Sequence, residues 1–170
     1  MKALGVDPGL VITGYGVLEQ QGSRIRLLEA GTIDAGNAQI PLPERLRRLY
    51  DELSSIIAQH QPDSMALEQL YSHYAHPRTA ILMGHARGVI CLAAGTHDIP
   101  LFHYGATQVK SALTGNGRAS KEQIQQMVRR TFGLVATPNP PDVADAVAIA
   151  LCHLNHQRRE SAQARLRIVT

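Results

Sequence analysis

A run near the C-terminus, VADAVAIALCHL at 143–154, is apolar on almost every side of a helix. A helix without a polar face must be buried inside a domain. Its one acid, Asp145, is followed three, four and seven positions later by Ala148, Ile149 and Cys152, so its carboxylate stands on an apolar face. A buried carboxylate is costly unless it is paired or coordinates a metal ion. We therefore expect the chain to fold around a buried helix on which Asp145 is a candidate site residue.

The order of the predicted elements indicates what surrounds this helix. The apolar residues first alternate as in strands, and from Leu42 they take the spacing of a helix. Predicted strands cover 3–7, 12–18, 24–33, 64–67 and 99–104, and predicted helices cover 42–57, 79–94, 106–113, a segment that begins with a capping box at Ser120, and 143–154. This order describes one α/β domain, a mixed sheet with helices on both faces, over residues 1–155. We expect the basic segment 156–170 to be a disordered tail.

Charge and composition narrow the classes of function. Residues 1–85 carry a net charge of −2 and residues 86–170 a net charge of +5, which permits a polyanionic partner. The two cysteines lie in apolar runs without metal-ligand spacing, which favours reduced, buried thiols. The start of the chain lacks a signal-peptide pattern, and the most apolar stretch, 79–94, is too short for a bilayer and contains His85 and Arg87. We expect a cytoplasmic protein without membrane contact.

Three further acids occupy positions that could join Asp145. Asp7 and Glu68 each end a predicted buried strand, and Asp142 precedes Asp145 by about one helical turn. A turn, a surface position and a helix start would explain each of these acids separately. If the two strands are parallel neighbours, however, all four carboxylates can meet at one sheet edge. Oxygen-only ligands select Mg²⁺ or Mn²⁺, and such a set is typical of a two-metal site for phosphodiester hydrolysis; the competing interpretation is four unrelated acids.

Several separated motifs occur in an order that resembles one known family. They are VDPGLVITGYGVL at 6–18, ALEQLY at 66–71, GHARG at 84–88, VK at 109–110 with GNGRASKEQIQQMV at 115–128, and PPDVADAVAIALCH at 140–153. This combination resembles the RuvC family of bacterial Holliday junction resolvases. The resemblance implies a ribonuclease H-like fold with a central five-stranded sheet, a homodimer, and paired symmetric nicks in a four-way DNA junction. It also implies contact with the RuvA-RuvB branch-migration complex.

The resemblance also implies roles for individual residues. The family's catalytic acids fall on Asp7, Glu68, Asp142 and Asp145, and its functional lysines on Lys110 and Lys121. An aromatic residue that unstacks bases near the crossover corresponds to Tyr71. Of the two lysines, Lys121 is the candidate for stabilising charge on the transferred phosphate and Lys110 for a backbone contact. Further phosphate contacts are expected at Arg78, Arg118, Arg129 and Arg130.

One segment departs from the family pattern, and three other functions stay open. The segment 72–78 is about one residue longer than the family pattern and lacks a Lys-Asn pair that is common in the family, so the resemblance does not extend to the details of junction and sequence recognition here. Its two histidines are left out of the site. The segment DPGLVITGYG also resembles the phosphate loop of actin-like ATPases and sugar kinases, but those proteins need two such domains. The sequence is also compatible with a non-catalytic binder of branched DNA and with a nuclease for RNA–DNA hybrids.

Overall fold

A computed structural model describes residues 1–69 and 77–168. Five strands form one sheet in the order β3-β2-β1-β4-β5. The bounds are β1 Lys2–Asp7, β2 Ile12–Gln21, β3 Arg24–Asp34, β4 Ser64–Glu68 and β5 Leu101–Tyr104. The first three strands pair antiparallel, whereas β4 is parallel to both β1 and β5. The predicted mixed five-stranded sheet is confirmed.

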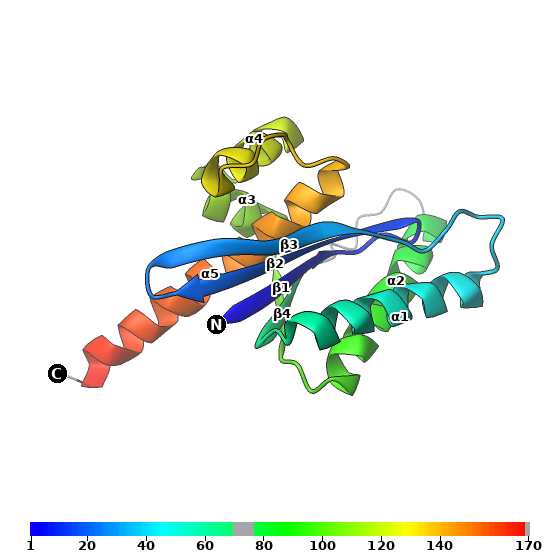
Figure 1. The fold of residues 1–170 in the computed structure, drawn as a ribbon, viewed down its shortest axis with the longest axis horizontal. Helices are drawn as coiled ribbons and strands as arrows, with labels where there is room; N and C mark the ends of the chain where they lie inside the picture. Colours follow the sequence, from blue (N-terminus) through cyan, green and yellow to red (C-terminus); the bar gives the residue numbers. More distant parts are fainter. Residues whose placement is uncertain (70–76, 169–170) are drawn as a thin grey trace.

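Helices cover both faces of the sheet (Figure 1). Their bounds are α1 Leu42–His60, α2 Pro77–Thr96, α3 Ala106–Thr114, α4 Lys121–Phe132 and α5 Pro141–Ile168. Strand β1 shows why two separate cores form, because successive side chains point to opposite faces. Leu4 and Val6 pack with α1 and α2, whereas Ala3 packs with α3, α4 and α5.

The apolar part of α5 lies directly against the sheet, as its composition predicts. The absence of a side chain at Gly5 allows this approach, since a Cβ there would lie 2.2 Å from the carbonyl oxygen of Ala146. Residues Ala144 and Ala146 through Ala150 are all fully buried. The N-terminal end of α5 is thereby held over the carboxyl end of β1.

Two helices are longer than the sequence pattern predicted. Helix α5 continues through residues 156–168 (Figure 1), the basic segment that we expected to be a disordered tail. The segment is rich in Arg, Gln and Ala, which are good helix formers, and contains no Gly or Pro to end the helix. Helix α2 is also longer than predicted, and by length and composition its window Thr79–Thr96 could cross a membrane, with 22% of it buried in the domain. Its buried residues Ala86, Ile90, Ala93 and Ala94 pack in the core beside α1.

A buried histidine joins α5 to the parallel strands. His153 is fully buried, and its two ring nitrogens are 2.8 Å from Ser64 Oγ and 2.8 Å from Tyr104 Oη. Burial is the largest effect on this ring and lowers its pKa to about 4. The folded protein therefore keeps His153 neutral in a range where the unfolded chain takes up a proton.

We expect this histidine to make folding sensitive to acid. A folded-state pKa below the unfolded value means that the stability from neutral His153 is present above about pH 6.5 and is lost as the pH falls toward 4. The stability advantage of wild type over His153→Gln should shrink by about 3 kcal/mol between pH 7 and pH 4 in urea unfolding. The same substitution at the half-buried His97 is the matched control. A constant difference between wild type and His153→Gln would contradict this account.

Candidate active site

Two of the predicted acids end neighbouring parallel strands. Val6 lies opposite Leu67 in the β1–β4 register, so the next residues, Asp7 and Glu68, stand side by side where the strands end. Parallel strands place their carboxyl ends at the same sheet edge, which is where ligands of α/β folds bind. The expected meeting of Asp7 and Glu68 is therefore a direct result of the strand order.

Hydrogen bonds from Arg45 and Thr13 hold the loop after Asp7. Arg45, a buried residue of α1, donates a hydrogen bond of 2.7 Å from Nη2 to the carbonyl oxygen of Leu10. The hydroxyl of the buried Thr13 donates to the Gly9 carbonyl (2.6 Å) and accepts from the Gly9 N–H (3.2 Å). These bonds fix the conformation of the loop. The loop in this conformation holds the end of β1 that carries Asp7.

Helix α5 brings the other two acids to the same edge. Asp142 and Asp145 lie in its first turns, and Gly14 of β2 is paired with Asp7 across the β1–β2 ladder. A Cβ on Gly14 would lie only 2.1 Å from the backbone oxygen of Asp142 and 3.1 Å from its Cβ. A side chain at position 14 would thus displace the start of α5. The glycine lets Asp142 sit over β2 beside Asp7.

The four acids form one electrostatic cluster. Burial, reinforced by repulsion from Asp145, Glu68 and Asp142 in that order, raises the pKa of Asp7 to about 7. Burial and then repulsion from Asp145 raise the pKa of Glu68. Burial is also the main reason that the pKa of Asp145 is raised, against the opposing effect of Lys121. Ionised carboxylates crowded in this way are stabilised by added positive charge.

Both lysines of the resemblance lie near this cluster. Lys121 Nζ is 3.8 Å from Asp145 Oδ2, an ion pair in which the lysine is 68% exposed. Lys121 is the first residue of α4, and the Ser120 side chain caps that helix by accepting the Gln123 N–H. The charge of Lys110, on α3, opposes the rise in the pKa of both Glu68 and Asp145. A well-exposed ammonium is thus available beside the acids.

The chemistry of the donors fits divalent cations. All four groups offer carboxylate oxygens, the ligands preferred by Mg²⁺ and Mn²⁺. Within residues 1–69 and 77–168, no three His, Cys, Asp or Glu side chains converge closely enough to hold an ion as they stand.

The expected DNA-contact residues divide into separate groups. Arg129 and Arg130 are exposed in the last turn of α4, two turns of helix away from Lys121. Arg118 is exposed in the turn before α4, and its backbone N–H donates to Asn116 Oδ1. These three arginines are not among the groups that shift the pKa of the acids. Tyr71 and the side chain of Arg78 lie outside the described residues, as do His73 and His76.

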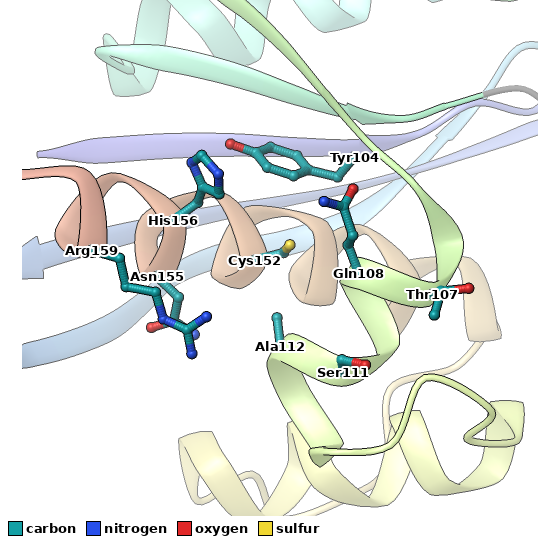
Figure 2. A pocket seen from close by; sticks show the side chains of 9 residues that line it. All are labelled: Tyr104, Thr107, Gln108, Ser111, Ala112, Cys152, Asn155, His156 and Arg159. Atoms are coloured by element: carbon teal, nitrogen blue, oxygen red, sulfur yellow. The ribbon is translucent and has the colours of Figure 1, made fainter.

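A cavity of about 320 Å³ between α3 and α5 is separate from the acids (Figure 2). It is lined by Tyr104, Thr107, Gln108, Ser111, Ala112, Cys152, Asn155, His156 and Arg159. None of the four carboxylates is among these residues. Burial raises the pKa of the Cys152 thiol to about 11, which leaves it unreactive. The acid cluster, rather than this cavity, is the candidate reaction centre.

Arg87 was not predicted as a site residue, and it contacts the site through the backbone. Its Nη1 donates to the carbonyl oxygen of Glu68 at 2.6 Å. In the sequence, Arg87 only interrupts an apolar helix and forms part of the GHARG motif. The sequence signal that could have identified Arg87 is the one that identified Asp145, a charged residue in an otherwise apolar helix.

Comparison with known proteins agrees with this geometry. The family model described as crossover junction endodeoxyribonuclease RuvC matches residues 3–153. The chain is 56% identical over 149 residues to the RuvC of Rhodopirellula baltica (88% of this chain, 83% of the relative) and 46% identical over 153 residues to that of Alkaliphilus oremlandii (90% and 92%). It superposes on the structure of Thermus thermophilus RuvC in complex with a Holliday junction substrate with a TM-score of 0.88 and 35% identity, over 94% of this chain and 96% of the other. The chain belongs to the RuvC family of crossover junction endodeoxyribonucleases.

Proposed function

We propose that the protein resolves four-way DNA junctions by cutting two strands symmetrically, with Asp7, Glu68, Asp142 and Asp145 as catalytic, metal-holding residues. The observation that carries this proposal is the cluster itself: four carboxylates from three elements gather beside an exposed lysine, and the pKa values of Asp7, Glu68 and Asp145 are raised by burial and by neighbouring carboxylates. Family membership supports the substrate, because the Thermus thermophilus relative was solved with a Holliday junction. Charged groups kept close against their own repulsion are typical of a functional site.

The chemistry we propose is hydrolysis with in-line displacement. Two divalent cations, Mg²⁺ or Mn²⁺, would be held by the four acids and would supply charge neutralisation and a more acidic water. Water attacks the phosphorus, the bond to the 3′-oxygen breaks, and the products are a 5′-phosphate and a 3′-hydroxyl that a ligase can join. Lys121 exchanges its ion pair with Asp145 for a hydrogen bond to a phosphate oxygen as charge develops there. Lys110 contacts the DNA backbone.

A second copy of the chain is required for two symmetric cuts, and α2 is the surface that we propose it uses. Ile81 is 62% and Leu92 is 60% exposed on this helix. At Gly84 and Gly88, no described atom beyond their own helix lies within 4 Å of where a side chain would start. An apolar face with glycines permits a close approach of a second helix. We also propose cytoplasmic location and contact with the RuvA-RuvB complex, which rest on the family alone.

The testing experiment compares substrates and cations in one assay. Labelled four-way junction, linear duplex and RNA–DNA hybrid are incubated with Mg²⁺, Mn²⁺ or EDTA. Wild type should nick the junction in pairs only with a cation, and Asp145→Asn should not nick it. The control Asp51→Asn, at an exposed side chain of α1, should behave as wild type. Cleavage of the hybrid alone, or junction binding without cleavage under any cation, would contradict the proposal. A monomer by light scattering would contradict paired nicking.

A further inference from the structure

We propose that Arg87 is a positioning residue that sets the place of Glu68 for cation binding, by clamping the carboxyl ends of β4 and β5 with Nη1 and Nη2 of its guanidinium. This inference rests on the proposed metal site and goes beyond it, since Arg87 itself holds neither cation nor DNA in this role. It concerns the backbone of Glu68, which determines where the carboxylate of this residue lies.

The clamp consists of two hydrogen bonds from one planar group. Arg87 Nη1 donates to the Glu68 carbonyl oxygen at 2.6 Å, and Nη2 lies 2.8 Å from His103 Nδ1. A guanidinium has donors only, so His103 must accept through an unprotonated Nδ1. Partial burial and then the charge of Arg87 lower the pKa of His103, which agrees with a neutral ring. One rigid fork thus fastens the last residue of β4 to a residue of β5.

The sheet ladder makes these two attachment points adjacent. His103 is the register partner of Leu67, and Glu68 pairs with Tyr104. The chain leaves β4 after Glu68, and the next N–H, of Gln69, still donates to the Tyr104 carbonyl at 2.8 Å. At the edge where the strand ends, the backbone of Glu68 would otherwise be free to pivot on one side. The Arg87 bond to its carbonyl removes that freedom.

The part of α2 that carries Arg87 is held rigid by core packing. Arg87 is flanked on α2 by the fully buried Ala86 and, one turn on, by Ile90, both packed in the core with α1. A side chain that extends from a fixed backbone and makes two bonds loses little further freedom, which makes it an effective positioning group.

Arg87 bonds the backbone carbonyl of Glu68, and within the described residues no hydrogen bond or ion pair joins its guanidinium to the Glu68 carboxylate. Arg87 therefore acts on the position of Glu68 through geometry. A lysine at this position would keep the charge but could not bridge both acceptors with a planar fork.

The experiment measures cation affinity in Arg87→Lys and Arg87→Gln against wild type, with Arg48→Gln, at a partly exposed position of α1, as the matched control. We expect both Arg87 variants to need about 10–100-fold more Mg²⁺ for half-maximal junction cleavage, with partial recovery at high Mg²⁺. Without DNA, the rise in melting temperature produced by Mn²⁺ should be smaller in both variants. Junction affinity in EDTA should stay within about twofold of wild type, because Arg87 does not contact DNA in this role.

Two results would overturn the clamp. The first is an Arg87→Lys protein whose Mg²⁺ midpoint and Mn²⁺ melting shift equal those of wild type. The second is a loss of junction affinity in EDTA that matches the loss of cleavage. If neither Arg87 variant folds, His103→Ala, an exposed substitution that removes one arm of the clamp, must raise the Mg²⁺ midpoint, and no change would refute the proposal. If wild type itself cleaves no junction, the proposed function fails instead, whereas the Mn²⁺ melting shift still tests the clamp.

Discussion

Asp7→Asn should reduce junction cleavage by at least about 10³-fold and leave junction binding nearly unchanged. Asp7 is the most strongly shifted of the acids, and its carboxylate is the one that Asp145, Glu68 and Asp142 all repel. An amide keeps the size of the side chain and one acceptor oxygen but removes the negative charge that attracts a cation. Cleavage should fall because the reaction loses the positive charge that this group would hold beside the phosphate.

Binding should survive because it depends on other groups. DNA affinity comes mainly from cations that contact phosphates, and removing one buried carboxylate reduces repulsion toward the DNA. The measurement pairs single-turnover cleavage in Mg²⁺ with an electrophoretic or anisotropy titration in EDTA, using Asp51→Asn as control. A parallel loss of binding and cleavage would show that Asp7 supports the fold or the interface, and would remove it from the reaction centre.

The meeting of the acids was predictable for a physical reason. A carboxylate on the same helix face as Ala148, Ile149 and Cys152 is costly to bury unless it is paired or binds a metal ion, which made Asp145 a candidate site residue. Asp7 and Glu68 could be placed beside it because parallel strands bring their carboxyl ends together. The sequence pattern alone does not show the contact of Asp142 with Gly14, which depends on how closely α5 packs on β2.

The features that were not predicted share a different origin. Arg87 acts on a backbone carbonyl, and every residue has one, so no spacing of side chains points to that contact. Residues 156–168 have the charge of a tail, but their helix propensity and the absence of Gly and Pro let α5 continue. Arg129 and Arg130 belong to the same basic half as Lys121 but lie at the other end of α4, and net charge does not distinguish these positions.

The same substitution, Asp7→Asn, should stabilise the metal-free fold. The pKa of Asp7 is about 7 in the folded protein and 3.8 as its ordinary value, so the folded state holds a proton that the unfolded state releases between these pH values. Stability is therefore lost as the pH rises from about 4 to 7, and at pH 8 the full cost is present, up to about 4 kcal/mol. Asp7→Asn carries no such cost, so in EDTA at pH 8 it should unfold at higher urea than wild type, with the difference vanishing near pH 4.

Divalent cations should reverse this order of stability, because they stabilise wild type much more than Asp7→Asn. An ion that binds the folded state at 100 times its Kd adds about 2.7 kcal/mol, and in wild type it also offsets the repulsion among the four acids. Saturating Mg²⁺ or Mn²⁺ at pH 8 should thus raise the urea midpoint of wild type markedly and that of Asp7→Asn much less, with Asp51→Asn following wild type. An equal cation shift in wild type and Asp7→Asn, or a less stable Asp7→Asn in EDTA, would mean that the crowded carboxylates are not a shared ion site. Agreement would instead show that the fold carries the cost of four close charges and that the cation relieves it.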